Sequence, residues 1–101
     1  MKLYWTYQAR EDLKEIGHYI AEDNPQAARR WITRLRDRAK KIPDAPRAGR
    51  IVPEFMKENI REVIEQNYRI VYQIKENRID ILTVFESHRL IPLEKPSEKD
   101  N

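Results

Sequence analysis

Four basic side chains near the C-terminal end of the chain are of the types that phosphate chemistry requires. Arg61 and Arg69 fall in two successive stretches with strand character, while His88 and Arg89 follow the last such stretch. Arginines stabilise charge that develops on phosphorus, and a histidine whose pKa is near neutrality can act as general acid or base. One interpretation of this set is therefore a phosphate-binding surface that cleaves RNA.

A plainer interpretation explains the same residues by ion pairing. Arg61 and Arg69 would then pair across strands with carboxylates of the same region, namely Glu62, Glu65, Asp80 or Glu86. His88 would be a polar residue at a strand end. From the residues alone, pairing is favoured over catalysis.

Other kinds of chemistry find little support in the composition. His18 and His88 are the only histidines, they lie far apart, and no cysteine or acidic framework accompanies them as metal ligands. Gly17 and Gly49 are the only glycines, which leaves no glycine-rich phosphate loop. We expect no metal and no cofactor.

Three stretches in this half of the chain predict strands. Tyr68–Ile74 and Arg78–Phe85 are rich in β-branched and aromatic residues, and the three residues between them predict an antiparallel hairpin with Asn77 at positive φ. Ile60–Ile64 predicts a third, more polar strand. Strict alternation would place Tyr68, Ile70, Tyr72 and Ile74 opposite Val71 on one strand, and Ile79, Ile81 and Phe85 opposite Leu82 and Val84 on the other.

The first 42 residues predict a strand and two helices that position this sheet. Lys2–Trp5 is a short apolar run, and Thr6 can cap a helix from Tyr7 to about Glu22. Asn24-Pro25 predicts the start of a second helix, since Asn is a strong N-cap and Pro suits the first helical position. The apolar stripes are Ala9, Leu13, Ile16 and Ile20 in the first helix, and Ala28, Trp31, Ile32, Leu35, Ala39 and Ile42 in the second. Basic residues fill the outer face of the second helix, a pattern that usually marks a solvated surface.

The predicted fold is α+β with the order β-α-α-β-β-β, an antiparallel sheet covered on one side by the helical hairpin. Both faces of the sheet are apolar, so the second face must be partly covered by the tail, by loops or by another protein. The 101 residues, of which 40% are hydrophobic and 37% charged, form one domain over residues 1–91. We expect residues 92–101 to be a mobile polar tail. Without an apolar leader or a run long enough to span a membrane, we expect a cytoplasmic protein with no membrane partner.

The ordered pattern over about eighty residues resembles the RelE/ParE superfamily of bacterial toxins from toxin–antitoxin modules. The matching residues are Ala9, Asp12, Leu13, Ile16, Tyr19-Ile20, Asn24-Pro25, Pro46, Gly49-Arg50, Arg61-Glu62, Tyr68-Arg69-Ile70-Val71-Tyr72, Ile81-Leu82, Val84 and His88-Arg89. The family's fold has the same element order. Its RelE-like members cut messenger RNA on the ribosome, and its ParE-like members poison DNA gyrase.

The resemblance favours the ParE-like branch, a protein-binding inhibitor rather than an enzyme. RelE-like members carry lysines on the first central strand, where this chain has Ile60-Arg61-Glu62-Val63. Arg69 matches an arginine of the family's central strand, and Arg89 falls near a second functional one. His88 resembles the terminal histidine of the YoeB branch, but Arg89 replaces the tyrosine that follows there. The alternative is a ribosome-dependent endoribonuclease that uses Arg61, Arg69, His88 and Arg89, with ribosome and mRNA as partners. A third hypothesis is a binding module without toxicity.

Every toxic branch of this family implies a cognate antitoxin whose C-terminal segment wraps the toxin in a hetero-oligomer. The net charge of +3 suits an acidic segment that folds on binding. We expect that contact on the uncovered apolar face of the sheet, together with the groove between helices and sheet.

Overall fold

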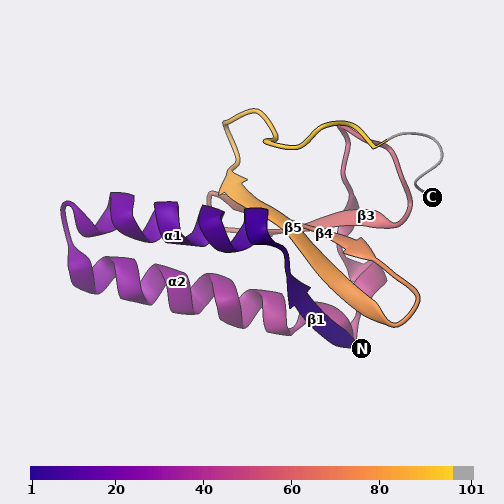
Figure 1. Ribbon diagram of the computed structural model, residues 1–101, viewed down its shortest axis with the longest axis horizontal. Helices are drawn as coiled ribbons and strands as arrows, with labels where there is room; N and C mark the ends of the chain where they lie inside the picture. The colour runs from indigo at the N-terminus through magenta and orange to yellow at the C-terminus, as the bar shows by residue number, and fades with distance from the viewer. Residues whose placement is uncertain (97–101) are drawn as a thin grey trace.

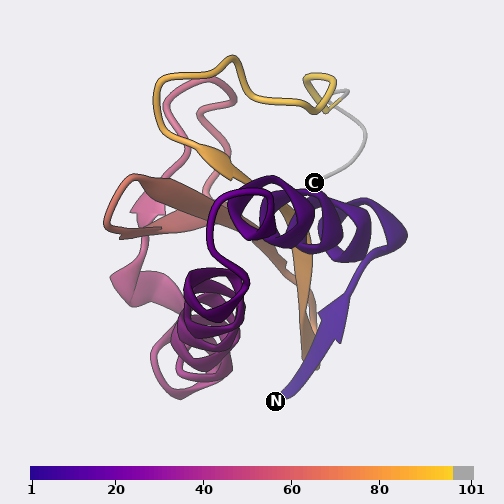
Figure 2. The same ribbon diagram turned by 90° about the vertical axis from the view of Figure 1, so that its left-hand side faces the viewer.

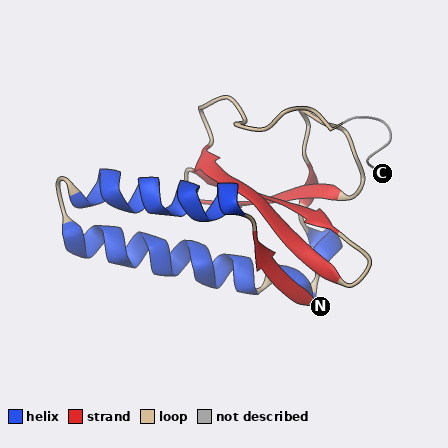
Figure 3. Cartoon of the chain, in the orientation of Figure 1, coloured by secondary structure: helices blue, strands red, loops and turns tan. Residues whose placement is uncertain are grey.

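The computed structural model describes residues 1–96, which form an α+β fold with one five-stranded sheet (Figures 1 and 3). The elements are β1 (Lys2–Trp5), α1 (Tyr7–Ala21), α2 (Pro25–Lys40), the 3-10 turns η1 (Ile42–Asp44) and η2 (Pro46–Ala48), β2 (Arg50–Ile51), β3 (Ile60–Glu65), β4 (Tyr68–Ile74) and β5 (Arg78–Glu86). The strand order in the sheet is β1-β5-β4-β3-β2. The predicted order of the helices and main strands is confirmed, and the sequence missed the two-residue edge strand β2 and the two 3-10 turns before it. None of the helices in this part of the chain is long and apolar enough to cross a membrane.

The sheet is mixed rather than wholly antiparallel. Strand β1 lies parallel to β5, with Leu3 opposite Ile79, whereas β2, β3, β4 and β5 pair antiparallel. A tight turn cannot connect parallel neighbours, and here the chain from α1 to β4 lies between β1 and β5. Figures 1 and 2 show both helices on one side of the sheet, with the end of the hairpin projecting beyond it.

Both helices begin at the caps that the sequence predicts. The Thr6 hydroxyl oxygen accepts a hydrogen bond from the Ala9 amide at 3.2 Å and donates to the Ile81 carbonyl at 2.7 Å. This single side chain therefore starts α1 and ties it to β5. The Asn24 side chain accepts from the Ala27 amide at 3.0 Å, with Pro25 at the first helical position.

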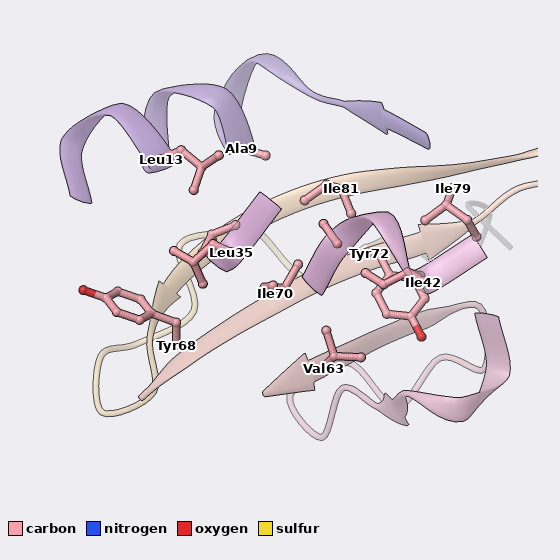
Figure 4. Packing of buried hydrophobic residues seen from close by; sticks show 12 residues of the cluster. Ala9, Leu13, Leu35, Ile42, Val63, Tyr68, Ile70, Tyr72, Ile79 and Ile81 are labelled. Carbon is pink, nitrogen blue, oxygen red and sulfur yellow. The ribbon is translucent and has the colours of Figure 1, made fainter. Parts of the chain in front are cut away.

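The main core lies between the helical hairpin and the sheet (Figure 4). Leu13 and Leu35 approach the sheet from the two helices, and Ile70, Tyr72 and Ile81 meet them. The predicted common face of Tyr68, Ile70, Tyr72 and Ile74 is confirmed, since all four belong to or pack against this cluster.

A second core covers the opposite face of the sheet and is closed by the chain itself. Its buried members are Val52, Phe55, Ile60, Val71 and Phe85, and Leu82, Ile91 and Leu93 pack against them. The loop before β3 and the segment after β5 thus occupy the apolar face that the sequence left uncovered. The prediction that loops and the tail partly cover this face is confirmed, and the antitoxin contact expected there stays a prediction. The last five residues of the predicted mobile tail, 97–101, lie outside the described residues.

A β-bulge in β5 changes which side chains face each core. Thr83 lies opposite Val71 and Ile81 opposite Tyr72, so Leu82 is an extra residue in the ladder. Beyond the bulge, Val84 joins the main core and Phe85 joins Leu82 on the other face. The prediction that Phe85 shares a face with Ile79 and Ile81 is therefore wrong by one residue of register.

Positive φ angles occur at positions other than the one predicted. Among the residues that the structure describes, the non-glycine residues with positive φ are Met56 at 54° and Gln66 at 55°. Gln66 lies in the turn between β3 and β4. Asn77 turns the β4–β5 hairpin without positive φ, and the Lys75 amide closes that hairpin by donating to the Arg78 carbonyl at 2.9 Å.

Candidate functional site

Arg69, the central member of the predicted basic set, is buried on the face of the sheet away from the helices. Only 7% of its side chain is exposed. Its Nε donates to Glu62 Oε1 at 2.6 Å, and its two Nη atoms donate to the two oxygens of Glu54 at 2.7 Å each. The guanidinium also lies 4.8 Å from the centre of the Phe85 ring. The prediction of ion pairing is confirmed for Arg69, since Glu62 is one of the four carboxylates offered as its partner.

Glu62 joins two arginines in one network. Its side chain is completely buried, and its second carboxylate oxygen accepts from Arg50 Nε. A buried carboxylate is costly unless it is paired and hydrogen-bonded, and here two guanidiniums meet that need. The network connects the edge strand β2 and the loop that follows it to β3 and β4, since Arg50 lies in β2 and Glu54 lies in that loop.

The network also shifts the pKa values of Arg69 and Glu54. The hydrogen bond with Glu54 is the main cause that raises the pKa of Arg69, and the contact with Glu62 adds to it against the effect of burial. In return, the hydrogen bond from Arg69 lowers the pKa of Glu54 below its ordinary value. The guanidinium is permanently charged, and its Nε and both Nη atoms are engaged by carboxylates of its own chain.

Arg61 lies on the opposite face of the sheet from Arg69. In the β3–β4 ladder Arg61 is opposite Tyr72, a main-core residue, and Arg69 is opposite Ile64, three residues further along β3. The Arg61 guanidinium donates to the backbone carbonyls of Glu58, Arg47 and Gly49 at 2.9–3.1 Å. It thus holds the loop that leads into β2, and its carboxylate partner is Glu58 at 3.8 Å rather than any predicted one.

His88 and Arg89 lie beyond the end of β5 and are mostly exposed. Both approach Glu86, with His88 Nε2 3.6 Å and Arg89 Nε 3.8 Å from its carboxylate oxygens, and their side chains are 73% and 68% exposed. Such pairs contribute little to stability. The structure therefore keeps His88 and Arg89 together, and places Arg61 and Arg69 on separate faces with separate partners.

Asp12, a carboxylate of the family pattern in α1, has a structural role. Its Oδ2 accepts from the Thr83 hydroxyl and from the Val84 amide, the latter at 3.1 Å. Thr83 is completely buried at the bulge of β5. Asp12 therefore fixes α1 to the irregular part of that strand.

A groove lies between α1 and α2, beside the edge strand β1. The sequence predicts a groove between the helices and the sheet, but not its position between the two helices. The volume of the groove is about 720 Å³. Leu13, Gly17 and Ile32 form its apolar part together with Trp5, and its cationic residues are Arg10, Lys14 and Arg36. Glu11 is the one carboxylate among the lining residues. The signal in the sequence was the Arg10–Lys14 and Leu13–Gly17 pairs, each one helical turn apart on one flank of α1.

Gly17 leaves space in this groove, but the packing of α1 against α2 does not require a glycine there. A Cβ built at Gly17 would lie 3.4 Å from Ile32 Cγ1, an ordinary van der Waals distance. Gly49 is different, because a Cβ there would lie 2.7 Å from the Glu62 carbonyl oxygen and would overlap the Tyr72 hydroxyl.

Comparison with known proteins agrees with this architecture. A family model described as "ParE toxin of type II toxin-antitoxin system, parDE" matches residues 3–91. A protein of Sinorhizobium fredii (strain NBRC 101917 / NGR234) named "Putative toxin Y4kP" is 34% identical over 93 residues, which are 90% of this chain and 93% of that protein. A chain of the solved structure "Chromosomal ParDE TA system from P. aeruginosa" has the same fold, with a TM-score of 0.71 and 24% identity over 85% of this chain and 95% of its own length. The match of the family model includes both helices and all of the sheet except Lys2.

Proposed function

The chain belongs to the ParE toxin family of type II toxin–antitoxin systems, and from this membership we propose that it inhibits growth by poisoning DNA gyrase and is neutralised by a cognate antitoxin. The observation that favours this over RNA cleavage is the engagement of Arg69 by Glu54 and Glu62. Cleavage needs an acid–base group and charge-stabilising groups aimed at one phosphate. The four basic residues of the predicted set instead have separate structural partners or are exposed at a strand end.

The groove between α1 and α2 is the surface that we propose for the antitoxin. Its apolar floor suits the apolar face of an amphipathic helix, which binds in grooves through side chains one turn apart. Its rim of Arg10, Lys14 and Arg36 suits acidic residues flanking that face. The occupant is thus an amphipathic, acidic segment of the antitoxin, and the product is a hetero-oligomer.

The first experiment compares the two proposed targets side by side. The antitoxin-free chain is added to purified gyrase in a supercoiling assay, and to ribosomes programmed with mRNA in a cleavage assay. Lost supercoiling or trapped gyrase–DNA cleavage complexes, with intact mRNA, is the expected result. Cut mRNA with unaffected gyrase would overturn the proposal, and a chain that is inactive in both assays and harmless on expression would reduce it to a binding module.

Exposed residues give the clean variants for this comparison. His88→Ala and Arg89→Ala remove side chains that are about 70% exposed, so neither should disturb folding. Inhibition of gyrase that survives both changes is expected. Loss of an RNA-cleaving activity in His88→Ala, without loss of folding, would instead assign the acid–base role to that histidine.

Antitoxin binding is tested at the rim of the groove. The double variant Lys14→Glu/Arg36→Glu should weaken binding of the cognate antitoxin by at least about 10-fold, or 1.4 kcal/mol. Lys2→Glu/Lys75→Glu makes the same change in net charge away from the groove and is the matched control. Equal effects of the two variants would reject the groove as the binding surface.

A further inference from the structure

Helix α2 holds more positive charge than the whole chain. Its sixteen residues include five arginines and one lysine against the single carboxylate of Asp37, a formal charge of +5. The chain as a whole has a formal net charge of +3, so the remaining residues together are slightly acidic. The positive charge of this protein is therefore concentrated on one element rather than spread over the surface.

The basic residues of α2 form one surface with two rows, which we call the arginine face. Arg30, Arg34 and Arg38 follow one another at four-residue steps on one flank, and Arg29, Arg36 and Lys40 lie on the other. Ala28, Leu35 and Ala39 face the core on the opposite side of the helix. Between the two rows lie only polar side chains, those of Gln26, Thr33 and Asp37.

Most of these guanidiniums are available to a ligand. Within residues 1–96, the side chains of Arg29, Arg30, Arg36 and Arg38 have no hydrogen bond or ion pair. Arg34 pairs with Glu65 at 2.5 Å, and Lys40 lies 3.8 Å from Asp37 with both side chains exposed. The row from Arg30 to Arg38 is about 12 Å long at 1.5 Å per residue.

We propose that the arginine face binds the phosphate backbone of duplex DNA without preference for sequence. Arginine is the residue that best binds phosphate, because its planar fork can donate two hydrogen bonds to one group. At about 3.4 Å of duplex axis per phosphate on each strand, a 12 Å row spans three to four phosphates. The major groove of B-DNA is about 12 Å wide and admits an α-helix, so rows on the two flanks of α2 would face its two phosphate walls.

The composition of this face favours duplex DNA over other polyanions. A protein interface needs an apolar core, and there is no apolar side chain between the two rows. A single-stranded nucleic acid needs exposed aromatic rings for stacking, but Trp31 is turned inward, in edge contact with Tyr68 at 5.3 Å between ring centres. The major groove of duplex RNA is too narrow for a helix. The projection of the hairpin beyond the sheet gives this helix room to meet a duplex (Figure 1).

The test measures DNA binding in the absence of gyrase and antitoxin, so its outcome is independent of the proposed toxic function. The full-length, antitoxin-free chain is titrated into a labelled duplex of about 20 base pairs, and fluorescence anisotropy is followed from about 50 to 200 mM salt. The logarithm of the association constant should fall with the logarithm of salt concentration with a slope of about −4 to −5, as expected for about five phosphate contacts.

Three variants separate the arginine face from general charge. Arg29→Gln/Arg30→Gln/Arg38→Gln should weaken binding at least about 10-fold at 50 mM salt and reduce the slope by about 2 to 3. Lys2→Gln/Lys75→Gln/Lys95→Gln has the same net charge and should change the slope by less than about 1. Asp37→Asn removes the one carboxylate of the face and should strengthen binding, a gain that an unfolded variant cannot produce.

The results that would overturn this inference are equally definite. They are no binding at 50 mM salt, equal losses in the two triple variants, or no gain from Asp37→Asn. Binding to duplex RNA or to polyglutamate as tight as binding to duplex DNA would also overturn it, and tight polyglutamate binding would assign the face to an acidic protein instead.

Discussion

Replacing Arg69 with alanine should cost the fold about 3–5 kcal/mol of unfolding free energy, the range for removing one partner of a buried ion pair. The change removes the 2.6 Å contact to Glu62, the two 2.7 Å contacts to Glu54 and the cation–π contact with Phe85. Glu62 would remain completely buried with Arg50 as its only strong partner. Since a domain of this size has a total stability of about 5–15 kcal/mol, the variant should melt at least about 12 °C below the wild-type chain.

Urea unfolding followed by circular dichroism measures this cost, and a second variant isolates its cause. Arg69→Met/Glu62→Leu replaces the buried charges with apolar side chains beside Val71 and Phe85, while Glu54 and Arg50 are exposed enough to be hydrated. This double variant should be more stable than Arg69→Ala by at least about 1 kcal/mol. Arg89→Ala is the exposed control and should lie within about 0.5 kcal/mol of wild type.

Two outcomes would refute the structural role of Arg69. The first is an Arg69→Ala variant as stable as the Arg89→Ala control, which would mean that the guanidinium does not support the fold and is available for function. The second is a double variant no better than the single one, which would show that the uncompensated Glu62 charge is not the source of the loss. If the role holds, lost toxicity in Arg69→Ala reports unfolding and cannot by itself indicate catalysis.

Three further predictions concern the two glycines, Asp12 and Glu54. Gly49→Ala should destabilise the fold by about 1–3 kcal/mol in urea unfolding, because its Cβ would overlap the Tyr72 hydroxyl. Gly17→Ala, whose Cβ would lie at an ordinary distance from Ile32, should stabilise the fold by up to about 1 kcal/mol. A Gly49→Ala variant more stable than Gly17→Ala would contradict this packing. Asp12→Ala should cost about 2–3 kcal/mol and Asp12→Asn less, since the amide keeps an acceptor for the Val84 amide; equal stabilities of wild type and Asp12→Ala would exclude the anchoring role. Because the pKa of Glu54 is lowered in the folded state, the contribution of this carboxylate to stability is complete above its ordinary pKa of 4.5 and is lost as the pH falls through the folded-state pKa. The stability advantage of wild type over Glu54→Gln should therefore be largest above pH 4.5 and shrink in acid. A difference that stays constant across an acid titration of unfolding would refute this linkage.

The sequence predicts the helices and the central strands because their signals are local. Thr6 and Asn24-Pro25 mark helix starts through contacts within three residues, and both caps form as expected. The bulge at Leu82 has no comparable signal. It moves Val84 and Phe85 to opposite faces from those that alternation predicts, and it is accommodated by Asp12, a residue seventy positions earlier in the chain.

The candidate site shows the same limit more strongly. The sequence contains enough carboxylates to pair with every arginine, and Glu62 is one of the four partners that it offers to Arg69. It does not show that Glu54 completes that pair, because Glu54 lies in an irregular loop whose path is set by Val52 and Phe55 packing on the second core. Nor does the sequence show that Arg61 donates to backbone carbonyls, since every residue has a backbone carbonyl and residue types do not indicate which one accepts.

The closure of the second sheet face by Ile91, Leu93 and the 52–55 loop has a consequence for both proposals. The chain itself occupies that face, and both surfaces proposed for partners lie on the helical hairpin. They meet only at Arg36, which lines the groove and belongs to one row of the arginine face. An antitoxin segment in the groove would engage Arg36 and leave the side chains of Arg29, Arg30 and Arg38 uncovered by the antitoxin. The neutralised complex would then keep most of the DNA contacts of the toxin. Neutralisation would act by keeping the toxin from acting on gyrase, and not by removing the toxin from DNA.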